Sequence, residues 1–235
     1  MGIFTEAAIK LLEMPGQVLW GFKPNLMRSI GEQHGAAKAL TWFVRNMPRY
    51  EKTVKDWGPI RTHLLVTEIS VLNGCPYCTY GHAYALQLHY FKETGQLLPV
   101  DENEMVAWHT LSEAEAIGQF RSLIQSSKLI GEHQTLGRML VLRQDNEQPA
   151  SKEDDQILHL VKMFSFLNQC GISGKTRLDQ AHDAINKDAA LRKPFSLLQR
   201  RGTEIPSPPR ALSVDPVSRC VHPGYIRRGA CCVLS

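Results

Sequence analysis

The sequence lacks any run of about 18 apolar residues, so no segment of it is expected to span a membrane. It also lacks a dense cluster of lysine and arginine. The 27 basic residues exceed the 23 acidic ones by only four, and so small an excess does not favour nucleic acid as a partner. The first residues hold no basic region followed by an apolar run, and no signal peptide is expected. These absences favour a cytoplasmic protein.

Cysteine is scarce, with six residues in a chain of 235. They are too few and too unevenly spread for the disulfide framework of a small secreted protein. In a reducing compartment, a close cysteine pair is more often catalytic or metal-binding than structural. The pair Cys75 and Cys78 is therefore the first candidate for a functional site.

Strand signals are also missing. No convincing alternation of apolar and polar residues occurs, and Asn73-Gly74 lies between two helical patterns, which predicts a turn between helices. Apolar residues recur at helical spacing along most of the chain, so the expected fold class is all-α. Asp101 and Ser112 mark two helix starts, because each is followed three residues later by glutamate. Other helices are predicted near residues 7–12 with a stop at Pro15-Gly16, at 36–44 with an end near Pro48, at 60–72, at 76–93, at 151–170 with a stop at Gly171, and, as a short helix, within 177–188.

The composition changes near residue 201. Residues 202–235 contain five prolines and no helical apolar period, which is typical of a segment that buries little surface. The sequence thus predicts one all-helical domain over residues 1–201 and a Pro-rich, disordered tail over 202–235. The tail ends in Cys232-Val233-Leu234-Ser235, which fits the pattern for prenylation.

The segment around the cysteine pair has the features of a helix start. Proline is favoured at the first helical position, so Pro76 makes Cys75 the cap residue and places Cys78 in the first turn. Free N–H groups and the positive end of the helix dipole then face both sulfur atoms and favour thiolate. Because Cys78 also has His82 one turn further on, its thiolate is expected to be the better stabilised. His82 could accept the thiol proton or protonate a leaving oxygen.

Three interpretations of the pair are open at this point. A redox pair needs two cysteines at a helix start and a nearby acid or base, and all of these are present. A zinc site would have to recruit ligands such as His82, His89 and Cys170, because no second cysteine pair has suitable spacing. The two cysteines could also be small buried residues. The remaining histidines, His182 among them, are expected to be surface or core residues.

The stretch Asn73-Gly-Cys-Pro-Tyr-Cys78, followed by His82, resembles the carboxymuconolactone decarboxylase/AhpD-like superfamily, and within it the alkylhydroperoxidase-like branch. The resemblance is strongest over residues 60–95. It implies an all-helical, AhpD-like domain that forms homo-oligomers, often trimers or multiples of them. It also implies reduction of organic hydroperoxides or hydrogen peroxide by a redox-active disulfide, with no bound cofactor and with electrons from a thioredoxin-like or lipoyl donor.

The resemblance also implies roles for individual residues. Cys78 matches the peroxidatic cysteine, Cys75 the resolving cysteine and His82 the proton-relay histidine. The relay glutamate of the family falls at His63 in this chain, and the nearest acid is Glu68. Either His63 replaces the carboxylate, or Glu68 reaches the site from a shifted face of the helix.

Two other functions compete with the peroxidase. One is a lyase acting on a lactone-type acid, as in the cysteine-free branch of the superfamily, although that chemistry needs no cysteine pair. The other is a non-catalytic redox sensor. Four tryptophans and many apolar helix faces favour an oligomer in either case.

Overall fold

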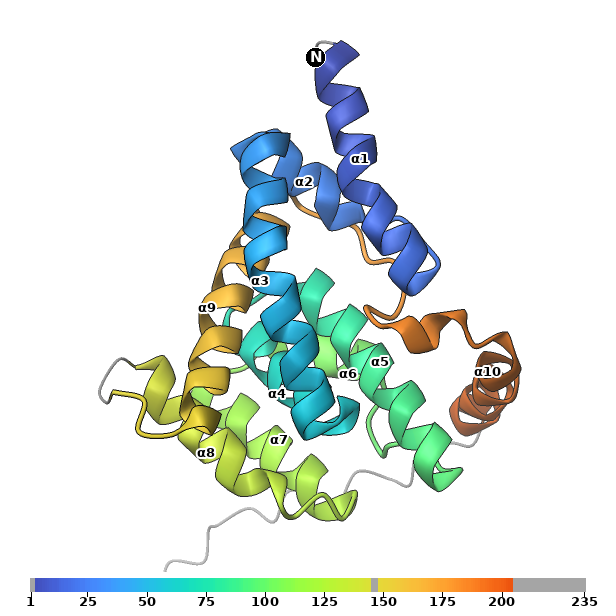
Figure 1. Ribbon diagram of the computed structural model, residues 1–235. Helices are drawn as coiled ribbons and strands as arrows, with labels where there is room; N and C mark the ends of the chain where they lie inside the picture. The colour runs from blue at the N-terminus through green and yellow to red at the C-terminus, as the bar shows by residue number, and fades with distance from the viewer. Residues whose placement is uncertain (1–2, 145–147, 205–235) are drawn as a thin grey trace, which may run out of the picture.

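The chain folds as an arrangement of helices (Figure 1). The structure is a computed structural model that describes residues 3–144 and 148–204. Within these ranges all regular elements are helices and no strand occurs, so the prediction of an all-α fold is confirmed. The α-helices are α1 (Ile3–Trp20), α2 (Asn25–His34), α3 (Ala36–Trp57), α4 (Pro59–Leu72), α5 (Pro76–Thr94), α6 (Glu102–Ala107), α7 (Glu113–Ser126), α8 (Glu132–Arg143), α9 (Lys152–Ser173) and α10 (Ala189–Glu204), and the short 3₁₀ helices are η1 (Trp108–Thr110) and η2 (Ala184–Lys187).

The helices α4 and α5 form the centre of the molecule. Ten consecutive residues of α4, Thr62 to Val71, are buried, so this helix packs on every side, as a central helix must. A short turn joins it to α5, and Gly74 in that turn has a φ of 72°, a conformation that glycine adopts without steric cost. The long helix α9 packs against α2, α4, α5 and α8. This arrangement places the start of α5, with the two cysteines, inside the protein.

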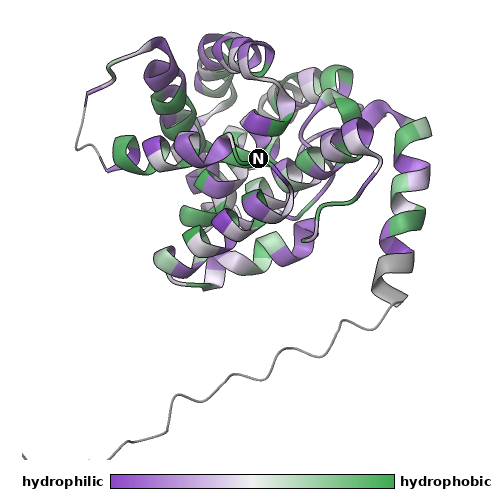
Figure 2. Cartoon of the chain, turned by 90° about the horizontal axis from the view of Figure 1, so that it is seen from below, coloured by the Kyte–Doolittle hydropathy of each residue, from purple (hydrophilic) through white to green (hydrophobic). Residues whose placement is uncertain are grey.

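The segment between α9 and α10 brings distant residues to the centre. Its 3₁₀ helix η2 packs against both α1 and α5. Beyond it, α10 lies at one side of the domain (Figures 1 and 2) and contacts α5 through a small separate core. In that core Phe195 is fully buried beside Ala85 and Leu88 of α5. The end of the described chain is thus attached to the helix that carries the cysteine pair.

Several predicted helix ends are wrong. The helix predicted over 36–44 continues through Pro48 to Trp57, and α1 continues through Pro15 to Trp20. Proline removes only one N–H from the helical hydrogen bonds, and in α3 the carbonyl that loses its partner belongs to Val44, an exposed residue that water can reach. Gly171 does not end α9, which runs to Ser173. Residues 177–188 hold only the 3₁₀ helix η2, and α2, α8 and α10 were not predicted.

The predicted helix starts are confirmed. Ser112 forms a complete capping box with Glu115, and Asp101 accepts hydrogen bonds from two N–H groups at the start of α6. Helix α10 runs to Glu204, three residues past the expected domain end at 201. The remainder of the predicted tail and the prenylation pattern lie outside the described residues. In the described part of the chain, no helix combines the length and apolar character needed to cross a bilayer.

Candidate active site

The two cysteines sit where the sequence predicts them, at the start of α5. Cys75 is the cap residue, and its Sγ accepts a hydrogen bond from the backbone N–H of Cys78 at 3.4 Å, with Pro76 at the first helical position. Both thiols are free and buried. A Cβ atom at Gly171 would lie only 2.9 Å from the Sγ of Cys75, so the backbone of α9 can approach the pair this closely only because that residue is glycine.

The electrostatics of the pair differ from the prediction. The side chain of Cys78 donates a hydrogen bond to Cys75, and this bond, against the opposing effect of burial, lowers the pKa of the Cys75 thiol. Burial raises the pKa of Cys78 well above its usual value, and the neighbouring Cys75 raises it further. A thiolate therefore forms more readily on Cys75 than on Cys78, whereas the helix-dipole argument suggested the opposite.

An apolar cavity of about 30 Å³ lies against Cys78 and His82. Its walls include Tyr50 of α3 and Phe164 of α9. A second apolar cavity of about 70 Å³ lies between α1 and α3. Both are lined by Trp20, Pro24, Met27, Phe43 and Met47. Cys78 thus faces the cavity, whereas Cys75 is not among the residues that line it.

A chain of hydrogen bonds leads from His82 to a carboxylate. Nδ1 of His82 lies 3.0 Å from Nδ1 of His63 on α4. Nε2 of His63 lies 3.2 Å from Oδ2 of Asp183, and Nε2 of His89 lies 3.0 Å from Oδ1 of the same carboxylate. Asp183 is itself fixed by the backbone N–H of Ile185, which it accepts at 2.7 Å. The chain joins α5, α4 and the segment before η2.

These contacts determine which nitrogen carries each proton. An ionised carboxylate only accepts hydrogen bonds, so Nε2 of His63 donates to Asp183. In a neutral imidazole the other nitrogen then accepts, and Nδ1 of His63 receives the N–H of Nδ1 in His82. The Nε2 atom of His82 is left with a lone pair. His82 is therefore a proton acceptor on the helix face that it shares with Cys78.

Burial keeps this relay in its neutral form. It lowers the pKa of His82 well below the usual value, and the neighbouring His63 and His182 lower it further. Burial also lowers the pKa of His63. Burial opposes ionisation of Asp183, but hydrogen bonds from His63 and His89 hold the pKa of that carboxyl far below its usual range. His82 and His63 thus favour the neutral form, and Asp183 favours the ionised form.

A second carboxylate, that of Asp179, is hydrogen-bonded to two residues of the cavity wall. The hydroxyl of Tyr77 donates to Oδ2 of Asp179 at 2.7 Å, and Nε2 of His182 lies 3.0 Å from Oδ1. The ring of His182 stacks on Trp20 with 5.6 Å between centroids, and its backbone N–H donates to the carbonyl of Gly81. The sequence predicts His182 as a surface or a core residue. It is buried and forms part of the cavity wall.

Glu68 does not join the relay. Its side chain is fully buried on α4, and within the described part of the chain neither carboxylate oxygen has a hydrogen-bond partner. Burial raises the pKa of Glu68 to about 8, although Arg121 and Arg143 act in the opposite direction. Of the two residues that the sequence offered in place of the relay glutamate, the structure places His63 in contact with His82.

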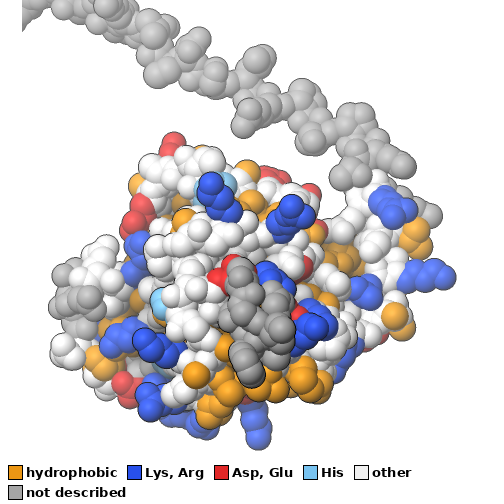
Figure 3. Space-filling model, turned by 90° about the horizontal axis from the view of Figure 1, so that it is seen from above, with side chains coloured by type: hydrophobic (Ala, Val, Ile, Leu, Met, Phe, Trp, Pro, Cys, Tyr) orange, Lys and Arg blue, Asp and Glu red, His pale blue; other side chains and the backbone are white. Residues whose placement is uncertain are grey.

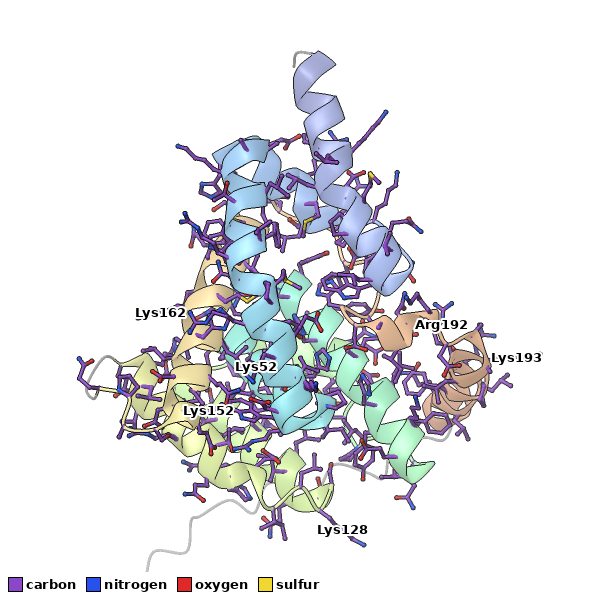
Figure 4. The ribbon with its side chains drawn as sticks, viewed as in Figure 1. Lys52, Lys128, Lys152, Lys162, Arg192 and Lys193 are labelled. Carbon is purple, nitrogen blue, oxygen red and sulfur yellow. The ribbon has the colours of Figure 1, made fainter. Side chains whose placement is uncertain are left out.

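Sequence reasoning missed Asp179 and Asp183, and with them the position of His182. The segment Asp179-Gln-Ala-His-Asp183 holds two acids and a histidine within five residues. This cluster is the sequence feature that could have marked them as candidate site residues. These residues are separated by about a hundred positions from the cysteine pair, so spacing alone could not connect them to it. The cationic side chains of Lys128, Lys162 and Lys193 point away from the interior (Figure 4). Among the described residues, neither lysine nor arginine lines the cavity.

Comparison of the chain with known protein families, with curated proteins and with solved structures gave no match. The resemblance of the cysteine segment to the AhpD-like superfamily is therefore carried by its own residues alone.

Proposed function

We propose that this protein is a thiol-dependent peroxidase that reduces hydroperoxides with the Cys75–Cys78 pair. One observation carries the proposal: Cys78 and His82 line the same cavity, and His82 is connected through His63 to the carboxylate of Asp183. A nucleophile, a base and a group that orients the base are the parts that nucleophilic catalysis needs.

The reaction has two steps within the protein. His82 takes the proton of Cys78, whose sulfur attacks the terminal peroxide oxygen. The O–O bond breaks, and His82 returns its proton to the leaving oxygen, which departs as an alcohol or as water. Cys78 is then a sulfenic acid. The thiolate of Cys75 attacks the sulfur of Cys78, a disulfide forms, and the oxygen leaves as water with a proton from solvent. The backbone N–H groups of Tyr77 and Cys78 donate to the Sγ of Cys75 and remain in place when Cys78 is oxidised, which favours the attacking thiolate in this second step.

The apolar cavity supports an organic hydroperoxide over hydrogen peroxide as the substrate. Its volume of about 30 Å³ is above the roughly 10–15 Å³ that a site needs to hold one water, so a small polar group such as a peroxide can enter it. The adjoining apolar cavity suits the organic part of the molecule. A dithiol donor, either a lipoyl group or a thioredoxin-like protein, would supply two electrons to reduce the Cys75–Cys78 disulfide. The donor itself would become a disulfide.

Exposed apolar residues support a homo-oligomer. Hydrophobic side chains gather in one area of the end of the molecule shown in Figure 3. The exposed large hydrophobic residues of α1 and α3 are Leu11, Met14, Val18, Leu19, Leu40 and Val44. Exposed apolar side chains concentrated on two neighbouring helices are typical of a subunit interface. The cytoplasmic location is part of the same proposal, because a reducing compartment would keep the pair ready to react.

The test is a thiol count before and after one equivalent of organic hydroperoxide, with mass spectrometry of the linked peptide. The peroxidase predicts loss of two thiols, a Cys75–Cys78 disulfide, and continued peroxide consumption when reduced dithiol is supplied. Stoichiometric oxidation without turnover in excess dithiol would favour the redox sensor. Turnover of a lactone-type acid, unchanged when both cysteines are replaced by serine, would favour the lyase.

A further inference from the structure

The far end of the relay has the geometry of a metal site. His63 comes from α4, His89 from α5 and Asp183 from the segment before η2. One ligand atom from each lies within 4.8 Å of those of the other two. The two imidazole nitrogens are 3.2 and 3.0 Å from the carboxylate oxygens. Around an ion with bonds of about 2.1 Å, neighbouring ligand atoms are about 3.0–3.4 Å apart, from octahedral to tetrahedral geometry.

We propose that His63, His89 and Asp183 bind a divalent transition-metal cation of the zinc class through the two Nε2 atoms and the Asp183 carboxylate. Two imidazoles with one carboxylate suit Zn²⁺, Co²⁺ and Fe²⁺ and leave positions open for water. The site can be reached from solvent, because the side chains of His89 and Asp183 are 15% and 17% exposed. This binding is independent of the proposed peroxidase activity.

The contacts around the three residues are those of a supported metal site. A histidine that ligates a metal almost always donates its other ring N–H to a neighbour, which fixes the orientation of the ring. His63 has such a neighbour, because its Nδ1 lies 3.0 Å from Nδ1 of His82. The Asp183 carboxylate is likewise fixed by the N–H of Ile185.

Metal binding would reverse the direction of the relay, and this part of the inference rests on the proposed function. An ion on Nε2 of His63 occupies the lone pair there, so the proton of His63 must sit on Nδ1. That N–H then donates to Nδ1 of His82, and the proton of His82 moves to Nε2. His82 loses the lone pair with which it would accept the proton of Cys78. The loaded protein should therefore be slow in thiol oxidation, and the cation acts as an inhibitor.

A titration of the full reduced chain with Co²⁺ tests the site directly. We expect visible d–d absorption without the near-ultraviolet charge-transfer band of thiolate ligation. His89→Ala should weaken binding by about 100-fold or more, beyond the 10–100-fold typical of a residue that only supports a ligand. Asp183→Asn, which keeps a capping side chain before η2, should do the same. His109→Ala removes an exposed histidine and should leave the spectrum unchanged, as should Cys75→Ser with Cys78→Ser. Circular dichroism of each variant checks the fold.

The outcomes are separable. The absence of Co²⁺ binding, or a thiolate charge-transfer band that disappears with the two serines, would overturn the metal site and leave the peroxidase proposal standing. If Co²⁺ binds as expected, peroxide consumption should fall by at least about tenfold in the wild type, within the range of a lost general base, and should not respond to Co²⁺ in His89→Ala. Unchanged consumption by the loaded protein would overturn the reversal of the relay. If the protein consumes no peroxide at all, the spectrum alone still decides the metal site.

Discussion

Nδ1 of His82 lies 3.0 Å from Nδ1 of His63, and both rings are buried. Two such nitrogens can form a hydrogen bond only when one carries a proton and the other does not. The Asp183 carboxylate decides which, because it requires the N–H of His63 on the opposite side of the ring. The position of one proton on His82 is thus set through His63 by the carboxylate of Asp183.

The two cysteines should respond differently to replacement. Cys78→Ser should abolish peroxide consumption, because the sulfur that faces the cavity is lost. Cys75→Ser should allow one oxidation and then stall as a sulfenic acid on Cys78, which a dimedone-type probe followed by mass spectrometry can detect. A sulfenic acid trapped on Cys75 in the Cys78→Ser protein would reverse the roles and indicate thioredoxin-like disulfide exchange.

Removal of the base should slow the reaction without preventing it. His82→Ala is expected to lower the rate of peroxide consumption by roughly 10²–10⁴-fold, as is typical for a lost general acid or base. His63→Ala should act through His82, as a positioning residue, and should change the pH profile of the rate as well as its maximum. Stopped-flow measurement from pH 5 to 9 would show both effects. Equal rates in His63→Ala and in the wild type would contradict the relay.

Glu68 predicts how stability depends on pH. Its pKa is about 8 in the folded protein against 4.5 for an ordinary glutamate. Because the folded pKa is raised, the stability contributed by protonated Glu68 is fully present below about pH 4.5 and is lost as the pH rises to about 8. Glu68→Gln should therefore stabilise the protein by about 2–4 kcal/mol at pH 8 and change little at pH 4.5. Urea unfolding at the two pH values measures the difference.

The same variant is the matched control for the relay. Glu68→Gln should leave peroxide consumption unchanged, since Glu68 makes no hydrogen bond to either relay histidine within the described residues. A loss of rate comparable to that of His63→Ala would show that Glu68 takes part in proton transfer.

A larger residue in place of Gly81 should destabilise the protein. A Cβ atom there would lie 2.2 Å from the ring of His182, so Gly81→Ala should displace that ring and cost about 1–3 kcal/mol, as overpacking of a core does. Gly118 on α7 has open space around it among the described atoms, and Gly118→Ala should stabilise the protein by about 0.4–1 kcal/mol. Thermal unfolding of both variants makes the comparison. Equal unfolding temperatures would contradict this prediction.

The sequence predicts those parts of the fold that depend on neighbouring residues. The cap at Cys75, the capping box at Ser112 and the all-α class follow from local rules, and each is present. The continuation of α3 past Pro48 depends on packing along the whole helix, which overrides the local cost of a proline. Asp183 escapes prediction because its role requires knowing that the chain returns to α5 after α9. The pKa order of the two thiols depends on the hydrogen bond that Cys78 donates to Cys75 and on the burial of Cys78, and both are properties of the folded protein.

The return of the chain after α9 also has a consequence for the order of synthesis. Both cysteines and His82 lie in the first half of the chain, whereas Asp179, His182 and Asp183 are made about a hundred residues later. A ribosome adds residues at about 5–20 per second, so the nascent pair exists for several seconds before its carboxylate partners are synthesised. A fragment that ends before residue 179 would hold both thiols with neither carboxylate. Full-length synthesis is therefore what couples the pair to its relay.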